Sequence, residues 1–379
     1  MKTAVKILSI LVVLSMMAFS LASCSTKKYD VICLEDENGE IVQGFNENML
    51  SFHMSMEKTD FLVNSLGSTA DIPEFWTVTV GEYAQIIGDE AVPGMEDKTF
   101  ADIQNEAAMR TAKDMIAASY MYEQLKGQDN VTGRLLADSD KKLEAQIDNQ
   151  VSQIQLAIGS KEDFNSFISG LGITMEDFRK YCEMSYKATE LRKAVDVSED
   201  DKKEYFGESY AIVKHILVNT NSKTNEAGEK VSLTAEEKEA KLSEVKTIEA
   251  RIASGEEFEA IFTEYEGADP GNAIYTEGYF VTDNGKFMPE FQDAALTMAE
   301  GEIKTVYTSY GAHVMKKYPM DKEKYNIYSD TSSEIETVLR NKAYSDLIKP
   351  YSEKVKTKDE VIAKYSMATV PMMTPAAAG

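Results

Sequence analysis

Residues 211–319 constrain the fold more than any other part of this 379-residue chain. The run 213–218 is β-branched and apolar, as expected of a strand, and two further strand-like runs flank Tyr310-Gly311. Two helical patterns and a short helix separate the first run from the last two. The order strand, helix, helix, short helix, strand, strand predicts a small α+β domain with an antiparallel sheet and flanking helices.

The chain has only three histidines, and two of them lie in this segment. His215 falls on its first predicted strand and His313 on its last, so the fold can bring them together. The third, His53, lies on the apolar stripe of a helical pattern that starts at Asn46. A histidine on such a stripe is expected to be packed, and not catalytic.

Charge and composition limit the classes of partner. The formal charge is −24, and Asp and Glu outnumber Lys and Arg by 64 to 40. Nucleic-acid binding needs clustered basic side chains, so we expect no nucleic acid partner. Hydrophobic residues make up 43% of the chain, which is enough for the cores of two or three domains.

The first residues form a targeting segment. Lys2 and Lys6 precede an apolar stretch at 7–21, which ends in Leu-Ala-Ser before Cys24. This ending resembles a bacterial lipobox and implies that residues 1–23 are cleaved, leaving Cys24 with a lipid. An ordinary signal peptide or an uncleaved anchor is the alternative. A lipid would hold the protein on the extracytoplasmic face of the cell membrane without a spanning helix, and no second apolar stretch is long enough to span.

Six short motifs give the central segment a family resemblance. In order they are KHILV at 214–218, ASGEEFEAI at 253–261, DPG at 269–271, MPEF at 288–291, GEI at 301–303 and YTSYGAH at 307–313. The segment resembles a parvulin-type peptidyl-prolyl isomerase domain, and with the leader the chain resembles PrsA- and SurA-like foldases. The resemblance implies isomerisation of X–Pro bonds in unfolded or partly folded exported polypeptides, without a cofactor or a metal.

The resemblance also implies roles for individual residues. Phe291 would form the floor of the proline pocket, and Phe287 and Met288 its wall. The remaining matches are the paired histidines on adjacent central strands, the hydroxyl that orients one imidazole, and a carboxylate facing the substrate: His215, His313, Thr308 and Asp269. From its place in the loop, Tyr310 is expected at the rim.

Each of these residues also has a purely structural interpretation. The three pocket residues Phe287, Met288 and Phe291 could be core, and His215 and His313 could be core histidines with satisfied hydrogen bonds. Asp269 before Pro-Gly could be only a turn former. A metal site built from the histidines and Asp269 fits no ligand-spacing motif. In addition, Phe287 is bulkier than the family's usual residue and would narrow the site.

The organisation expected for the whole chain is a parvulin-like domain inserted between helical segments that together form an all-α chaperone domain. Residues 67–97, rich in Gly and Pro, are expected to be irregular, and Pro350 is expected to end the last helix. The expected boundaries are signal peptide 1–23, lipid-anchored tether 24–45, helical chaperone domain 46–205, isomerase domain 206–320, returning C-terminal helix 321–366 and disordered tail 367–379.

Two other functions are compatible with the sequence. A non-enzymatic holdase chaperone would keep the helical segments and carry an inactive parvulin domain. A solute-binding lipoprotein would share the leader, but that class has two alternating β/α lobes, which long helices around one small α+β insert do not match.

Overall fold

The computed structural model describes residues 28–224 and 227–373. They divide into two compact units. Unit 1 takes the residues up to Asp196 and those from Arg340 onward, and unit 2 takes Val197–Leu339. The predicted signal peptide, the lipidation site Cys24 and residues 374–379 lie outside the described residues. Within those residues, no helix is both long and apolar enough to span a bilayer.

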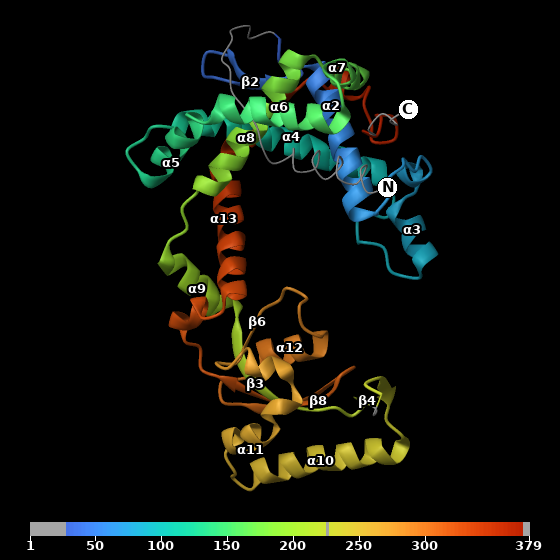
Figure 1. The fold of residues 1–379 in the computed structure, drawn as a ribbon, viewed down its shortest axis with the longest axis vertical. Coiled ribbons are helices and arrows are strands. Elements are labelled where there is room, and N and C mark those ends of the chain that lie inside the picture. Colours follow the sequence, from blue (N-terminus) through green and yellow to red (C-terminus); the bar gives the residue numbers. More distant parts are fainter. Residues whose placement is uncertain (1–27, 225–226, 374–379) are drawn as a thin grey trace. The chain divides into compact units, whose positions relative to one another are not determined.

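Unit 1 is mainly helical (Figure 1). Its helices and helical turns are α2 (Glu47–Asp60), η1 (Phe61–Ser65), η2 (Phe75–Thr77), α3 (Val80–Ile87), α4 (Phe100–Leu125), α5 (Val131–Asp140), α6 (Leu143–Ile158), α7 (Lys161–Gly170), α8 (Met175–Ala194), the later part of α13 (Ser329–Ser352) and α14 (Asp359–Ile362). Its strands are β1 (Ile32–Glu35), β2 (Ile41–Phe45) and β9 (Lys356–Thr357).

Local signals explain where many of these helices begin. Ser160 starts α7 with a capping box, and the Thr174 side chain accepts a hydrogen bond from Asp177 N at the start of α8. Thr79 forms a further capping box that starts α3. The prediction that 67–97 is irregular was therefore wrong for α3, which is bounded by Thr79 and the left-handed Gly88.

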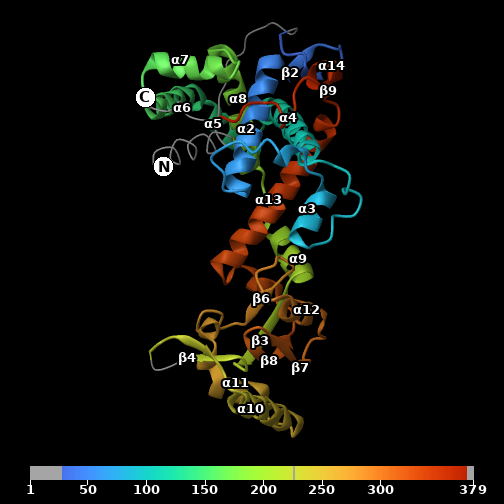
Figure 2. The same ribbon diagram turned by 90° about the vertical axis from the view of Figure 1, so that its right-hand side faces the viewer.

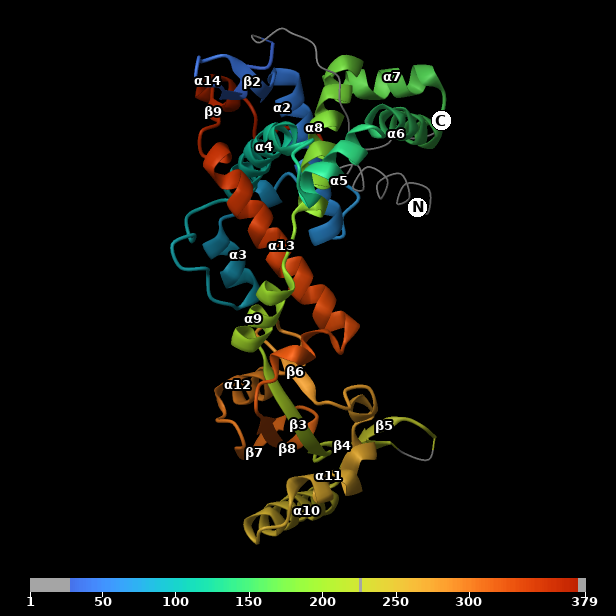
Figure 3. The same cartoon turned by 90° about the vertical axis from the view of Figure 1, so that its left-hand side faces the viewer.

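The residues expected to be a tether form part of the core. β1 and β2 pair antiparallel, and β1 also pairs with β9 from the other end of the chain. The strand order is β2-β1-β9, in the region labelled β2, β9 and α14 in Figure 3. Ile32 and Phe45 are fully buried. The tether prediction was wrong for 28–45, because these residues gain more by pairing and burial than they lose in chain entropy. An all-α domain was expected here, and the sheet shows that this expectation was wrong for unit 1.

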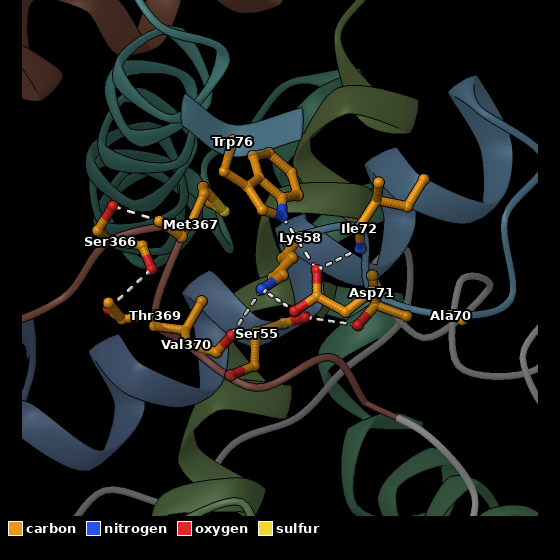
Figure 4. A network of polar contacts seen from close by, with 12 residues as sticks. Ser55, Lys58, Ala70, Asp71, Ile72, Trp76, Ser366, Met367, Thr369 and Val370 are labelled. Carbon is orange, nitrogen blue, oxygen red and sulfur yellow. Dashed lines mark hydrogen bonds and ion pairs between the residues drawn. The ribbon is translucent and has the colours of Figure 1, made fainter. Parts of the chain in front are cut away.

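The last described residues are also part of unit 1. Met367, Val370 and Met373 are buried in the same core cluster as α2 and α4 (Figure 4 shows part of this region). The prediction of a disordered tail from 367 was therefore wrong for 367–373, because an alanine- and proline-rich composition says nothing about long-range contacts. Pro350 lies inside α13, which continues to Ser352, so it does not end that helix.

Unit 2 combines a four-stranded antiparallel sheet with helices. The sheet order is β6-β3-β8-β7, formed by β3 (Ala211–Val218), β6 (Tyr279–Val281), β7 (Ile303–Thr308) and β8 (Gly311–Tyr318). A separate hairpin pairs β4 (Ser222–Thr224) with β5 (Lys230–Ser232). The helical elements are α9 (Glu199–Ser209), α10 (Ala235–Ala253), α11 (Phe258–Tyr265), η3 (Glu266–Ala268), η4 (Pro270–Ala273), α12 (Pro289–Thr297), η5 (Lys322–Asn326) and the start of α13.

The sheet of unit 2 has two covered faces (Figures 1 and 2). Val213 and Met315 pack with Phe291, Ala294 and Ala295 of α12 on one face. On the other face, α10 and α11 cover a second cluster that includes Ile216, Val218, Ala312 and Val314. Side chains alternate between faces along a strand, so the odd-numbered residues of β3 and β8, including both histidines, lie on the α12 face.

The unit boundaries differ from the predicted domain boundaries of 205/206 and 320/321. α9, η5 and the start of α13 belong to unit 2, because Phe206, Tyr210 and Tyr325 form a cluster with Ile212 of β3 and Phe280 of β6. The α+β fold class predicted for the central segment is confirmed, with helical segments on both sides of it in the sequence.

Candidate active site

Strand pairing places the two histidines of unit 2 next to each other. His313 is the register partner of Leu217, two residues along β3 from His215. Because both point to the α12 face, the imidazoles meet diagonally across the pair of strands. Their Nδ1 atoms are 3.1 Å apart, and both side chains are buried.

A chain of hydrogen bonds runs through these imidazoles. Tyr310 N donates to Thr308 Oγ1 at 3.1 Å, and Thr308 Oγ1 lies 2.9 Å from His313 Nε2. At the other end, His215 Nε2 lies 3.0 Å from Asp269 Oδ2. The chain therefore connects the backbone of the β7–β8 turn to a carboxylate in the loop that precedes η4.

The direction of each hydrogen bond follows from the two ends of the chain. Ionised Asp269 only accepts, so the His215 Nε2–H donates to it. With one proton on each ring, His215 Nδ1 must accept from the His313 Nδ1–H, and His313 Nε2 must accept from the Thr308 hydroxyl. Every donor and acceptor in the chain is then satisfied, and each imidazole is held in one tautomer.

Asp269 has three partners, which makes it both a turn former and a member of this chain. Besides His215, the Tyr279 hydroxyl donates to Oδ2 at 3.1 Å and Gly271 N donates to Oδ1 at 2.8 Å. The hydrogen bond from His215, followed by those from Gly271 and Tyr279, outweighs the effect of burial and lowers the pKa of Asp269 to about 2. The carboxylate is therefore ionised at neutral pH.

For His313, the surroundings favour the uncharged form of the side chain. Its desolvation, reinforced by the neighbouring His215, lowers the pKa of His313 to about 4, although Asp269 acts in the other direction. Loss of solvent disfavours the charged form of an imidazole. At neutral pH, His313 is therefore uncharged, as the tautomer assignment above requires.

Aromatic rings cover the histidines on the α12 face. The Phe291 ring centroid lies 5.1 Å from that of His215 and 5.3 Å from that of His313, with edge contacts to both. Phe287 stacks on Phe291 at 5.6 Å with 19° between the ring planes. Phe291 is only 4% exposed, whereas Phe287 and Met288 are half-buried. Phe287 thus covers Phe291, the predicted floor of the pocket, in addition to lying beside it as a wall.

The rim residues come from the β7–β8 turn. Met288 Sδ lies 4.0 Å from Ser309 Oγ. Tyr310 is 53% exposed, and the Lys230 ammonium lies 5.5 Å from its ring centroid. The structure therefore brings the residues predicted for the site in unit 2 into one contiguous group, with Phe291 and the histidines inside and Tyr310 outside.

Two members of the site were not identified from the sequence. Tyr279 donates to Asp269, and its ring lies 5.0 Å from His215. Gln292 holds the loop before α12, because its amide donates to Asp283 and its carbonyl accepts from Gly285 N. Tyr279 enters the site because it pairs with Val213 of β3. This pairing joins two distant stretches, so it could not be predicted from the sequence.

No group of three His, Cys, Asp or Glu side chains in residues 28–224 and 227–373 is arranged to hold a metal ion. The imidazole nitrogens are instead engaged in the chain from Thr308 to Asp269.

Comparison with known proteins agrees with this geometry. Residues 196–318 match the family model of the PPIC-type PPIase domain. The chain carries a parvulin-type peptidyl-prolyl isomerase domain. The PPIase domain contains every residue of the site, from His215 to His313.

The chain around the PPIase domain is also similar to known proteins. The foldase protein PrsA of Caldanaerobacter subterraneus subsp. tengcongensis is 27% identical over 292 residues, which cover 71% of this chain and 85% of that protein. PrsA of Staphylococcus epidermidis is 28% identical over 255 residues, covering 62% and 71%. The chain is thus similar to PrsA foldases over 71% of its length and contains a PPIC-type peptidyl-prolyl cis-trans isomerase domain. A solved structure of PrsA from Bacillus cereus is 19% identical, with a TM-score of 0.29, and covers 70% of this chain and 92% of its own.

Proposed function

We propose that this protein is a lipid-anchored, extracytoplasmic foldase that isomerises X–Pro bonds of exported polypeptides at the site beneath Phe287. The observation that carries the proposal is the unbroken hydrogen-bond chain from Tyr310 N to Asp269, lying under an apolar ring surface. This combination serves a reaction that needs no nucleophile.

Rotation about an X–Pro amide must overcome the partial double-bond character of the C–N bond, with a barrier of about 18–20 kcal/mol. Water stabilises the charge-separated resonance form that stiffens this bond. An apolar surface that removes water from the carbonyl favours the twisted amide, which has lost that resonance. A site accelerates the reaction when it binds the twisted amide better than the planar one.

The proposed roles follow from the positions of the residues. Phe291, Phe287 and Met288 bind the proline ring, and Tyr310 contacts the flanking chain at the rim. The polar field on the other side of the rings is fixed and comes from the hydrogen-bonded set His215, His313, Thr308 and Asp269. Because each imidazole is locked in one tautomer, the field does not have to reorganise while the amide turns.

A peptide isomerisation assay tests this role. Exchange between the isomers of a proline tetrapeptide is measured by NMR for the wild type, Phe291→Leu and His215→Asn. We expect catalysis by the wild type and at least about a tenfold loss in each variant, since Phe291→Leu removes the ring that binds the proline and His215→Asn breaks the hydrogen-bonded set behind it. The matched control is Thr247→Ala on α10, which alters an exposed side chain of the same unit and should retain full activity. Absence of wild-type catalysis would reject the enzyme role.

We further propose that unit 1 holds unfolded clients. Large apolar side chains of α3 and the loop after it are exposed, with Ile86 at 75% and Ile87 at 55%, joined by Tyr83, Val92 and Met95. Exposed apolar groups this close together are typical of interaction surfaces. Methionine adapts to varied partners because its side chain is flexible and polarisable.

Suppression of aggregation tests the holding role. The double variant Ile86→Ser with Ile87→Ser should suppress the aggregation of an unfolded protein less than the wild type does. The matched control changes Val131 and Leu135 of α5 to serine, since they are similarly exposed, at 52% and 50%. Equal suppression of aggregation by the wild type and both double variants would show that the exposed side chains of α3 do not hold clients.

The location is proposed from the leader alone. Lipid on Cys24 would tether the mature protein to the outer face of the cell membrane, and exported polypeptides are its clients there. Incorporation of labelled fatty acid into the wild type but not into Cys24→Ala tests this anchor.

A second candidate is a holdase whose PPIase domain binds but does not isomerise. The observation in its favour is the stack of Phe287 on Phe291, which covers the floor of the site. Aggregation suppression without isomerisation in the two assays above would select it.

A further inference from the structure

A short loop carries the Phe287 ring into the site. Residues 283–288, which we name the cover loop, lie between β6 and α12 and have neither helix nor strand geometry. The first four residues of the loop are exposed, and only Phe287 and Met288 are half-buried. Backbone with few buried apolar contacts opens easily unless other contacts hold it. The position of the Phe287 ring therefore depends on the polar contacts of the cover loop.

One set of these contacts comes from α12 and from the loop itself. The buried Gln292 amide donates to Asp283 Oδ1 at 2.8 Å, and its carbonyl oxygen accepts from Gly285 N at 3.3 Å. Within the loop, Lys286 N donates to Asn284 Oδ1 at 3.1 Å. These contacts leave the Asn284 amide nitrogen and the Lys286 ammonium group to a partner outside α12.

That partner is Glu334 of α13. Its Oε1 accepts from Asn284 Nδ2 at 2.7 Å, and its Oε2 accepts from Lys286 Nζ at 2.6 Å. The Glu334 side chain is 22% exposed, against 54% for Lys286. One carboxylate thus binds both residues that flank Gly285, and the second of them directly precedes Phe287 in the chain.

The start of α13 has a fixed place in unit 2. Ile335 is fully buried in the cluster that contains Phe280 of β6. Asp330 lies four residues before Glu334, so both carboxylates are on one face of the helix. Asp330 Oδ2 accepts from the Tyr275 hydroxyl at 3.4 Å. This face of α13 therefore contacts the loop before β6 as well as the cover loop after it.

We propose that Glu334 is a positioning residue that keeps the Phe287 ring stacked on Phe291 and so limits access to the proline pocket. A proline ring that binds on Phe291 must displace the Phe287 ring. Contacts that keep the cover loop in place favour the stacked position of that ring over the open one. The inference rests on the proposed binding of proline by Phe291 and adds to it the residue that holds its cover.

Binding and turnover of an uncharged proline tetrapeptide test this role. NMR titration gives the Kd, and isomer exchange gives kcat/KM, for the wild type and Glu334→Ala. We expect Glu334→Ala to bind the peptide about two- to threefold more tightly and to raise kcat/KM by the same factor, as suits the loss of a partly exposed ion pair. The matched control is Glu323→Ala, which removes an ion pair of the same unit, 2.7 Å from Lys203, and should leave both values unchanged.

Two further measurements separate positioning from a general effect on folding. Phe287→Met has no aromatic stack to hold, so the addition of Glu334→Ala to it should leave the Kd unchanged. Raising the salt concentration from about 0.02 M to about 0.5 M should tighten binding by the wild type towards the Glu334→Ala value, because salt screens an exposed ion pair. The same change of salt should not alter binding by Glu334→Ala.

Unchanged or weaker peptide binding by Glu334→Ala would overturn the proposal. An equal effect of Glu334→Ala with and without the Phe287 ring would also overturn it. Failure of the isomerase role gives a different result, because tighter binding by Glu334→Ala without any catalysis would support the positioning role and reject turnover. A wild type that binds no tetrapeptide would reject both.

Discussion

The Nδ1 atoms of His215 and His313 lie 3.1 Å apart, one on each of two paired strands, and share a single proton between two nitrogens. The pair can make this hydrogen bond only if one ring presents N–H and the other a lone pair. Asp269 and Thr308, at opposite ends of the hydrogen-bond chain, decide which ring donates and which accepts. The tautomers of both histidines are therefore set by two residues outside the imidazole pair.

Thr308 is a positioning residue, and its replacement should change the tautomer of His313. Thr308→Val keeps the shape but leaves His313 Nε2 without a donor, so we expect about a tenfold loss in kcat/KM, in line with one buried hydrogen bond. Nitrogen chemical shifts of the imidazoles should reveal a mixed tautomer state. Thr308→Ser restores the hydroxyl and should restore both readouts. Normal shifts in Thr308→Val would contradict this role.

Phe287 should limit access to the site. A proline ring that binds on Phe291 must displace the Phe287 ring stacked there. An aromatic pair of this kind contributes about 0.5–1.5 kcal/mol. Phe287→Met removes the stack while keeping an apolar surface. If the whole of that energy is released, kcat/KM on a proline tetrapeptide should rise about two- to tenfold. A fall would mean that the Phe287 ring gains more from binding the proline than its stack on Phe291 costs.

His313 should make the stability of unit 2 depend on pH. Its pKa in the folded protein is about 4, below its ordinary value of 6.5, so between these values the unfolded chain binds more protons. The stabilisation is thus complete above pH 6.5 and is lost as pH falls towards 4, by an amount on the order of 1–3 kcal/mol. Urea unfolding from about pH 7 to about pH 4 should show this loss in the wild type and a smaller one in His313→Gln.

Asp269 should add a second loss at lower pH. Its pKa is lowered to about 2 from an ordinary value of 3.8, so its stabilisation is present above about pH 4 and disappears as pH falls through about 2. Asp269→Asn should remove this acid-dependent step in the same unfolding experiment. An unchanged profile below about pH 4 would show that the carboxylate has no such role.

Gly311 should be essential to the hairpin that carries Thr308 and His313. Its φ is +146°, and a Cβ there would collide with the Val218 carbonyl oxygen. Gly311→Ala should therefore cost about 3 kcal/mol or more in unfolding free energy, because backbone must move. Gly285→Ala is the matched control, since Gly285 also has a positive φ but no atom within 4 Å of the added Cβ. It should cost only about 1–2 kcal/mol.

Much of the site could be predicted from the sequence because its signals are local. Alternation along 213–218 and 311–318 fixes which side chains share a face, and the motif YTSYGAH holds Thr308, Tyr310 and His313 close together in the chain. The helices α7, α8 and α10 start at capping residues that lie three positions from their partners. Such patterns need no knowledge of the rest of the fold.

Other features were decided only by the tertiary structure. The sequence does not show that Tyr279 reaches Asp269, that Phe287 stacks on Phe291, or that residues 28–45 and 366–373 are core. Lys58 and Val370 are 312 positions apart, and their hydrogen bond exists only because β1, β9 and α2 bring the first and last described segments together. Contacts of this kind depend on the free energy of burying many residues at once, which no stretch of neighbouring residues encodes by itself.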